Sequence, residues 1–150
     1  MKLMKRMMMA TAIIVAAPLA LSTPAMADDF PLVAGDYTTM TGIYIQDGGT
    51  VAYAKYLASE WKKNQDFAKS KGWISDYKIY FNVDARDGEP NMYLTQTYPY
   101  WPSGAESEKR NKEWEAFDKR TNAQLDAESG NRAKFRTVKG SMTLQEATIR

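Results

Sequence analysis

Apolar and polar positions alternate with a period of two in four stretches of the chain. These stretches cover residues 37–46, 73–83, 91–98 and 138–144. A period of two is typical of strands that bury one face. The second and third stretches are separated by residues 84–90, which are rich in Asp, Gly and Pro. So short a loop of turn-forming residues predicts an antiparallel hairpin.

Two other stretches follow a helical period. After Thr50, which we expect to be an N-cap, apolar residues from Val51 onward recur at intervals of three and four until Gly72, a residue typical of helix ends. Residues 106–128 are rich in Glu, Lys, Arg and Ala and place Trp114 and other apolar residues at helical intervals. We expect one continuous second helix there, with its charged residues on a solvated face.

The order β-α-β-β-α-β predicts an α+β fold of the ferredoxin-like type. In this fold a four-stranded antiparallel sheet carries two helices on one face. The opposite face of the sheet has no helix and must be solvated or covered. The loops that carry the turn signals, including the acidic residues of 84–90, are explained by hairpin geometry rather than by a metal site.

The first residues of the chain have a different composition from the remainder. Lys2, Lys5 and Arg6 precede an almost wholly apolar run over residues 7–21, and Ala25-Met26-Ala27 supplies small residues before Asp28. This three-part pattern predicts a secretory signal peptide that is cleaved after Ala27. The apolar run is short for a membrane span, and a proline interrupts it.

Cleavage divides the chain and changes its charge. We expect a signal peptide at 1–27, an N-terminal extension at 28–36 and one domain at 37–150. The chain has 20 Lys and Arg and 18 Asp and Glu. Three of the basic residues lie in the signal peptide, so the mature chain would keep 17 basic and 18 acidic residues and a net charge of −1. Because both signs are interspersed, we expect no nucleic-acid partner and no membrane association after cleavage. The predicted location is periplasmic or secreted.

The chain contains no Cys and no His. These absences exclude a disulfide framework, a metal site of the Cys and His type, a cysteine nucleophile and a Ser-His-Asp triad. We therefore expect neither a metal nor another cofactor. The domain must be held together by a conventional core, to which dimerisation would add.

The face of the sheet away from the helices mixes aromatic, apolar and polar residues. The alternation assigns seven residues to this face: Met40, Tyr44, Tyr80, Tyr93, Asp76, Lys78 and Asn82. Tyrosines suit a surface that buries ring area while the hydroxyl keeps a polar partner. We expect the face to be covered, and the alternative is a half-exposed sheet face on which scattered tyrosines have no special role.

These features are similar to those of the dimeric α+β barrel superfamily. The similarity spans Tyr37 to Leu144 and includes a first helix with Trp61, a Lys71-Gly72-Trp73-Ile74 segment leading into the second strand, and the strand Tyr77-Lys78-Ile79-Tyr80. The superfamily includes small exported proteins. The resemblance implies a homodimer in which two protomers close their open sheet faces against each other.

The resemblance leaves three functions open. One is an exported binding protein that holds a small apolar or aromatic ligand in the cavity between the two sheets. A second is a cofactor-independent enzyme of the oxygenase, cyclase or isomerase type in the same cavity, with no catalytic residue assigned. The third is a structural or interaction protein whose dimer interface is filled by side chains. Haem branches of the superfamily commonly hold iron through a His, which this chain lacks.

The candidate ligand-binding residues are aromatic side chains of the open face and two charged neighbours. We expect the tyrosines to line the cavity and one charged group to orient the ligand or move a proton. A tryptophan in the aromatic and proline-rich segment 98–102 is expected at the cavity mouth, and the alternative is that this segment packs over the edge of the sheet. The complete set is Tyr44, Tyr80, Tyr93, Trp101, Asp76 and Lys78.

Overall fold

The computed structural model describes residues 30–150, so the predicted signal peptide at 1–27 lies outside the described residues. The elements follow in the order β1 (Leu32–Ile45), α1 (Thr50–Tyr56), the π-helical turn η1 (Leu57–Trp61), α2 (Lys62–Ser70), β2 (Asp76–Phe81), β3 (Met92–Tyr98), α3 (Gly104–Asp118), α4 (Asn122–Arg132) and β4 (Arg136–Ile149). This is an α+β fold with the ferredoxin-like order β-α-β-β-α-α-β.

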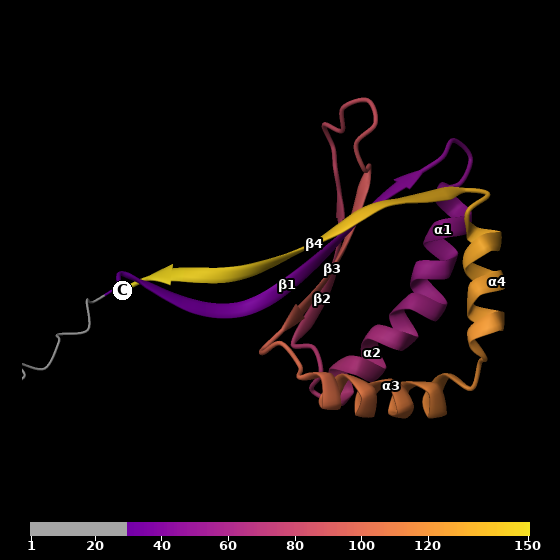
Figure 1. The fold of residues 1–150 in the computed structure, drawn as a ribbon. Coiled ribbons are helices and arrows are strands. Elements are labelled where there is room, and N and C mark those ends of the chain that lie inside the picture. Colours follow the sequence, from indigo (N-terminus) through magenta and orange to yellow (C-terminus); the bar gives the residue numbers. More distant parts are fainter. Residues whose placement is uncertain (1–29) are drawn as a thin grey trace, which may run out of the picture.

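The four strands form one sheet in the order β2-β3-β1-β4, and every neighbouring pair is antiparallel. The predicted four-stranded antiparallel sheet is therefore confirmed. Figure 1 shows the helices to one side of this sheet, with α1, η1 and α2 beside it. The other face of the sheet carries no helix of residues 30–150 and is called the open face below.

β1 and β4 are longer than the sequence pattern predicts. β1 begins at Leu32, which pairs with Ile149 at the end of β4, and Figure 1 shows the two strands leaving the sheet as a paired arm. The pairing register shifts between Ala34 and Tyr37. The shift breaks the alternation at the residues before Tyr37, and this is why the pattern placed the start of the strand too late.

The core lies between the sheet and the first helical segment. Ile43, Ile45 and Met92 of the sheet are buried against Tyr53 of α1 and Leu57 of η1. Burying these apolar side chains is the main favourable contribution to folding. The helical pattern that begins at Val51 missed Tyr53, which is 2% exposed, whereas Val51 is 65% exposed.

The π-helical turn keeps one row of side chains on the sheet. Tyr53, Leu57, Trp61 and Gln65 are spaced four residues apart, and all four are buried or half-buried. In a regular α-helix of 3.6 residues per turn, residues four apart drift around the axis. The wider turn at Leu57–Trp61 reduces that drift because a π-helix has more residues per turn.

The first helix begins at Thr50, so its N-cap lies one residue before the predicted one. Gly49 occupies the cap position, and no side chain caps the helix, so the prediction of Thr50 is wrong. A Cβ atom on residue 49 would lie 2.5 Å from the carbonyl oxygen of Phe135. The close approach of the segment before β4 therefore selects a glycine over a side-chain cap at this position.

The single helix predicted over residues 106–128 is wrong, because two helices occupy this region. α3 ends at Asp118, and its C-cap Lys119 has a left-handed φ angle of 62°. Thr121 then starts α4 with a capping box, in which its side chain and that of Gln124 each bond to the other's backbone N–H. The Thr-x-x-Gln spacing is a recognised helix start and was present in the sequence.

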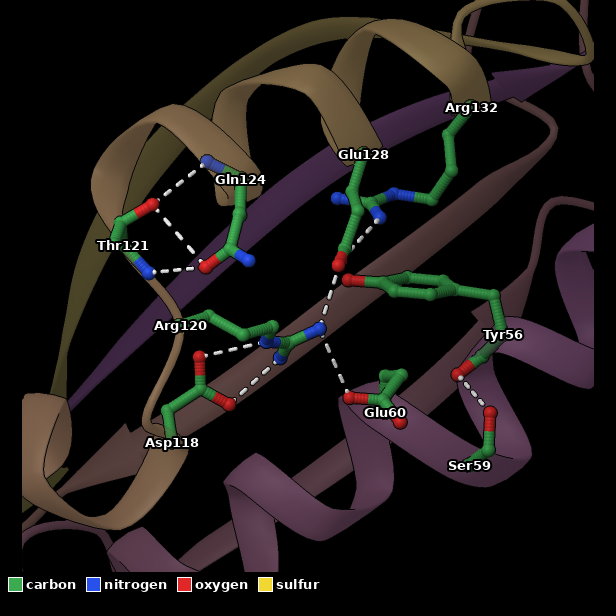
Figure 2. Close-up of polar contacts among 9 residues, drawn as sticks. All are labelled: Tyr56, Ser59, Glu60, Asp118, Arg120, Thr121, Gln124, Glu128 and Arg132. Atoms are coloured by element: carbon green, nitrogen blue, oxygen red, sulfur yellow. Dashed lines mark hydrogen bonds and ion pairs between the residues drawn. The ribbon is translucent and has the colours of Figure 1, made fainter.

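Arg120, between the two helices, joins them to η1 (Figure 2). Its guanidinium lies 2.7 Å from a carboxylate oxygen of Asp118, 2.7 Å from Glu128 and 3.1 Å from Glu60. The Asp118 side chain is fully buried, with 0% exposure. These carboxylates raise the pKa of Arg120 above its usual range, and the hydrogen bonds that Arg120 donates to Asp118 are the largest cause.

α4 packs on the first helical segment through charged and aromatic side chains. The Arg132 guanidinium lies 4.2 Å from the centre of the Tyr56 ring, and Figure 2 shows the two side by side. In α3, Arg110 is 8% exposed and bonds to the Tyr100 hydroxyl at 2.9 Å. The expectation of a solvated charged face is therefore wrong at Arg110 and at Arg120, whose side chain is only 20% exposed.

Candidate functional site

The open face carries a row of residues that crosses all four strands. Tyr80 lies opposite Tyr93, Tyr93 opposite Gly42, and Gly42 opposite Gly140. Residues directly opposite each other in an antiparallel sheet project to the same face. Two tyrosines and two glycines therefore share one row, with the side chains at one end and bare backbone at the other.

The paired glycines leave a hollow in the open face. Its volume is about 260 Å³, and its walls come from β1, β3, β4 and the hairpin loop before β3. A Cβ atom on Gly42 would lie 2.6 Å from Cγ of Pro90. The glycine is thus required for the loop to approach the strand. The residues that line the hollow are Met40, Gly42, Pro90, Tyr93, Lys139, Gly140, Ser141 and Met142.

The rest of the open face mixes exposed apolar side chains with polar ones. Met40 lies opposite Met142, and the next open-face position pairs Thr38 with Leu144. Met142 is 53% exposed, Leu144 50% and Tyr80 47%. Exposed apolar side chains grouped on one face are typical of a surface that contacts a partner or a ligand.

The structure brings most of the predicted site residues to this face. Tyr93 lines the hollow and Tyr80 lies beside it. Tyr44 is two residues beyond Gly42 on the same strand, and the ammonium of Lys139, which also lines the hollow, lies 5.3 Å from the centre of its ring. The sequence alternation did not identify Lys139 as a site residue.

The two predicted charged residues form an ion pair at the start of β2. Nζ of Lys78 lies 3.3 Å from one Asp76 carboxylate oxygen, and Nζ of Lys69 from α2 lies 3.2 Å from the other. The hydrogen bonds from Lys69 and Lys78 lower the pKa of Asp76 below its usual range. Asp76 is therefore an ionised acceptor at neutral pH.

Trp101 lies apart from the other predicted residues within one protomer. Its ring centre is 5.9 Å from that of Tyr37 and 5.7 Å from that of Tyr98. Tyr37 of β1 lies opposite Tyr98 of β3. Each is an even number of residues from Ile43 or Met92 on its own strand, so both tyrosines face the helices as those residues do. Trp101 thus packs over the end of the helix-facing side of the sheet.

A second cavity, which the sequence did not predict, lies on the helix-facing side. It has a volume of about 210 Å³ and is lined by side chains of α1, η1, β1, β3 and β4, among them Tyr53, Tyr56, Trp61 and Arg136. Burial raises the pKa of Tyr53 to about 12, and the positive charge of Arg136 acts in the opposite direction. Arg136 and the aromatic residues are far apart in sequence, so no spacing signals their proximity.

No metal site is found among residues 30–150, where no group of three or more acidic residues is arranged to hold an ion. In the acidic hairpin loop, the Glu89 carboxylate accepts a hydrogen bond of 3.0 Å from the backbone N–H of Arg86. This contact agrees with the turn interpretation of the loop. No helix in the same part of the chain is both long and apolar enough to span a membrane.

Comparisons with known proteins give one distant structural likeness. No protein-family model matches the chain. No curated protein matches it in sequence. A crystal structure of a dimeric ferredoxin-like protein from an uncultured marine organism covers 79% of this chain and 98% of its own, at 12% sequence identity and a TM-score of 0.38. A likeness this distant does not indicate the function of this chain.

Proposed function

We propose that this chain is an exported homodimer that holds a small apolar or aromatic molecule between its two open sheet faces. Export is supported by the three-part sequence pattern of residues 1–27. N-terminal sequencing of the secreted protein tests this part. Asp28 as the first residue is the expected result, and a mature protein that begins at Met1 would contradict it.

Dimerisation is supported by the composition and exposure of the open face. Met142, Leu144 and Tyr80 are about half exposed there. Tyrosine and methionine are enriched where proteins contact each other, and two stacked sheets pack about 10 Å apart. A second copy of the same face is therefore a suitable cover, because a two-fold axis would match each apolar row with its equivalent.

Ligand binding is supported by the hollow above Gly42 and Gly140, which is the observation that carries the proposal. Its volume is about 260 Å³, and it lies on the open face between β1 and the edge strand β4, beside Tyr93 of β3. Two protomers that face each other would enclose two such hollows. Tyr93 and Met142 offer ring and thioether surface, and Lys139 offers one polar group to orient a ligand.

The charges on this face favour binding over proton transfer. A general base works best when its pKa lies near the working pH. The pKa of Asp76 is lowered by Lys69 and Lys78, so its carboxylate is a weak base at neutral pH.

The dimer is tested by placing a charge on the open face. Tyr80→Asp would bury a carboxylate in the interface, and we expect the dissociation constant to rise at least about a hundredfold. Lys112→Asp on exposed α3 is the control and should leave the dimer unchanged. Light scattering over a concentration series measures both. A wild-type monomer at tens of micromolar, or equal effects of the two substitutions, would contradict the proposal.

The ligand is tested by a thermal-shift screen with aromatic acids, quinones and short polyketide-like compounds. We expect at least one compound to raise the melting temperature of the wild-type protein, and Tyr93→Ala to reduce the shift. If no compound stabilises a protein that is nevertheless dimeric, the binding proposal is wrong and the open face has a purely structural role.

A further inference from the structure

The cavity on the helix-facing side of the sheet has the composition of a separate small-molecule site. Its volume of about 210 Å³ corresponds to about seven molecules of liquid water at about 30 Å³ each. This space suits a single aromatic ring with one or two small substituents. The sheet itself separates the cavity from the hollow over Gly42 and Gly140.

Arg136 provides a positive charge at this cavity. The side chain is half-buried at the start of β4, and it donates a hydrogen bond of 3.2 Å from Nη2 to the hydroxyl of Ser129. Within residues 30–150 it has no ion pair, in contrast to Arg120, which lies within 3.1 Å of three carboxylates. A half-buried guanidinium with only a neutral partner retains donors for an anion.

The cavity walls beside Arg136 are aromatic side chains, and contacts with neighbouring rings and with Arg132 hold them in position. The rings of Tyr53 and Tyr56 are stacked with their centres 5.6 Å apart, and Arg132 lies 4.2 Å from the centre of the Tyr56 ring. Trp61 meets Tyr77 edge to face at 5.3 Å. These contacts fix the rings before any ligand arrives, which lowers the entropic cost of binding.

The sheet side of the cavity adds a polar group opposite the rings. The Thr41 hydroxyl shares a hydrogen bond of 2.8 Å with the Ser141 hydroxyl. A hydroxyl pair that shares one hydrogen still has a donor and several lone pairs for another partner. Thr41 can therefore bond to a hydroxyl substituent on a bound ring, while Ile43 and Val138 supply apolar surface.

We propose that this cavity binds a small aromatic monocarboxylate, whose carboxylate pairs with Arg136 and whose ring lies against Tyr53, Tyr56 and Trp61. A guanidinium matches a carboxylate through two parallel hydrogen bonds, which a lysine does not reproduce. These three aromatic side chains line the cavity. This inference concerns a different site from the open face and does not depend on the dimer.

Isothermal titration of the protein expressed from the complete sequence tests the site, with benzoate and 4-hydroxybenzoate as probes and benzamide as the neutral analogue of benzoate. We expect saturable benzoate binding and at least about tenfold weaker binding of benzamide. Arg136→Gln should weaken benzoate about tenfold or more, with Arg136→Lys intermediate. Arg86→Gln, on an arginine that is 87% exposed in the hairpin loop, is the matched control.

Two further variants locate the site and guard against loss of folding. Val138→Trp should fill the cavity and abolish benzoate binding, whereas Lys112→Asp on the exposed side of α3 should leave the affinity within about twofold. Circular dichroism and the melting temperature confirm that each variant folds. The inference is overturned if neither acid binds saturably, if benzoate and benzamide bind equally, or if folded Arg136→Gln or Val138→Trp protein binds like the wild type.

Discussion

The two faces of the sheet are built from alternate residues of the same strands, yet only one of them is covered. Ile43 and Met92 lie under α1 and η1 and are 2% and 3% exposed. Met142 and Leu144 lie on the open face and are 53% and 50% exposed. Apolar side chains thus lie on both faces, but only those on the helix-facing side are covered within one protomer.

This contrast separates what holds one protomer together from what is available to a partner or ligand. The covered face supplies the core of Ile43, Tyr53, Leu57 and Met92, which stabilises the single chain. The open face contributes little to that core and keeps its apolar area in contact with water. Burying that area against a second copy would be favourable by the same hydrophobic effect.

A matched pair of leucine substitutions tests this separation and has the largest expected effect. Leu57→Ala removes a core side chain that is 5% exposed, so we expect the free energy of unfolding to fall by about 3 kcal/mol. Leu144→Ala on the open face should cost less than about 1 kcal/mol in dilute protein, with a larger loss where the dimer forms. Urea denaturation at two protein concentrations measures both. If the two variants lose the same free energy of unfolding in dilute protein, the open face contributes to the stability of one protomer as much as the core does.

The next effect concerns the layer of α3 and α4 behind the covered face. Arg120→Ala leaves the fully buried carboxylate of Asp118 without its cation, and we expect a loss of about 2 kcal/mol. Adding Asp118→Asn should recover part of the loss, because it removes the uncompensated charge. Lys112→Ala is the exposed control. If the Arg120 and Lys112 variants unfold at the same urea concentration, the ion cluster does not stabilise this layer.

Tyr53 gives the covered face an alkaline pH dependence. The unfolded chain loses the Tyr53 proton near pH 10, whereas burial raises the folded pKa to about 12. Stability is therefore complete below pH 10 and falls as the pH rises through this window, by at most about 1.4 kcal/mol per pH unit. Tyr53→Phe should remove this part of the slope. Urea midpoints of both proteins between about pH 9 and 12 measure the difference, and parallel curves would contradict the assignment.

The sequence predicted the sheet more successfully than the helices because strand alternation is a local signal. Tyr80 and Tyr93 were assigned to one face, and the register places them opposite each other. The break between α3 and α4 also had a local signal, the Thr121 and Gln124 spacing, but the regular charge pattern of 106–128 obscured it.

The features that the sequence missed depend on contacts between distant segments. The burial of Arg110 requires Tyr100 and the backbone of Trp73, and the cavity beside Arg136 requires α1 to lie against β4. Similarly, the expectation for Trp101 came from its place in a loop, whereas its ring contacts Tyr37 and Tyr98. No single-segment pattern contains this information, because packing decides it.

The distance between two copies of a labelled open face tests the central claim most directly. The chain has no cysteine, so Lys78→Cys and Lys112→Cys each provide one site for a spin label. If the open faces pair at a sheet separation of about 10 Å, dipolar spectroscopy should find a short intermolecular distance for the label at residue 78 and a longer one for residue 112. No dipolar coupling at residue 78, or a shorter distance at residue 112, would contradict the account.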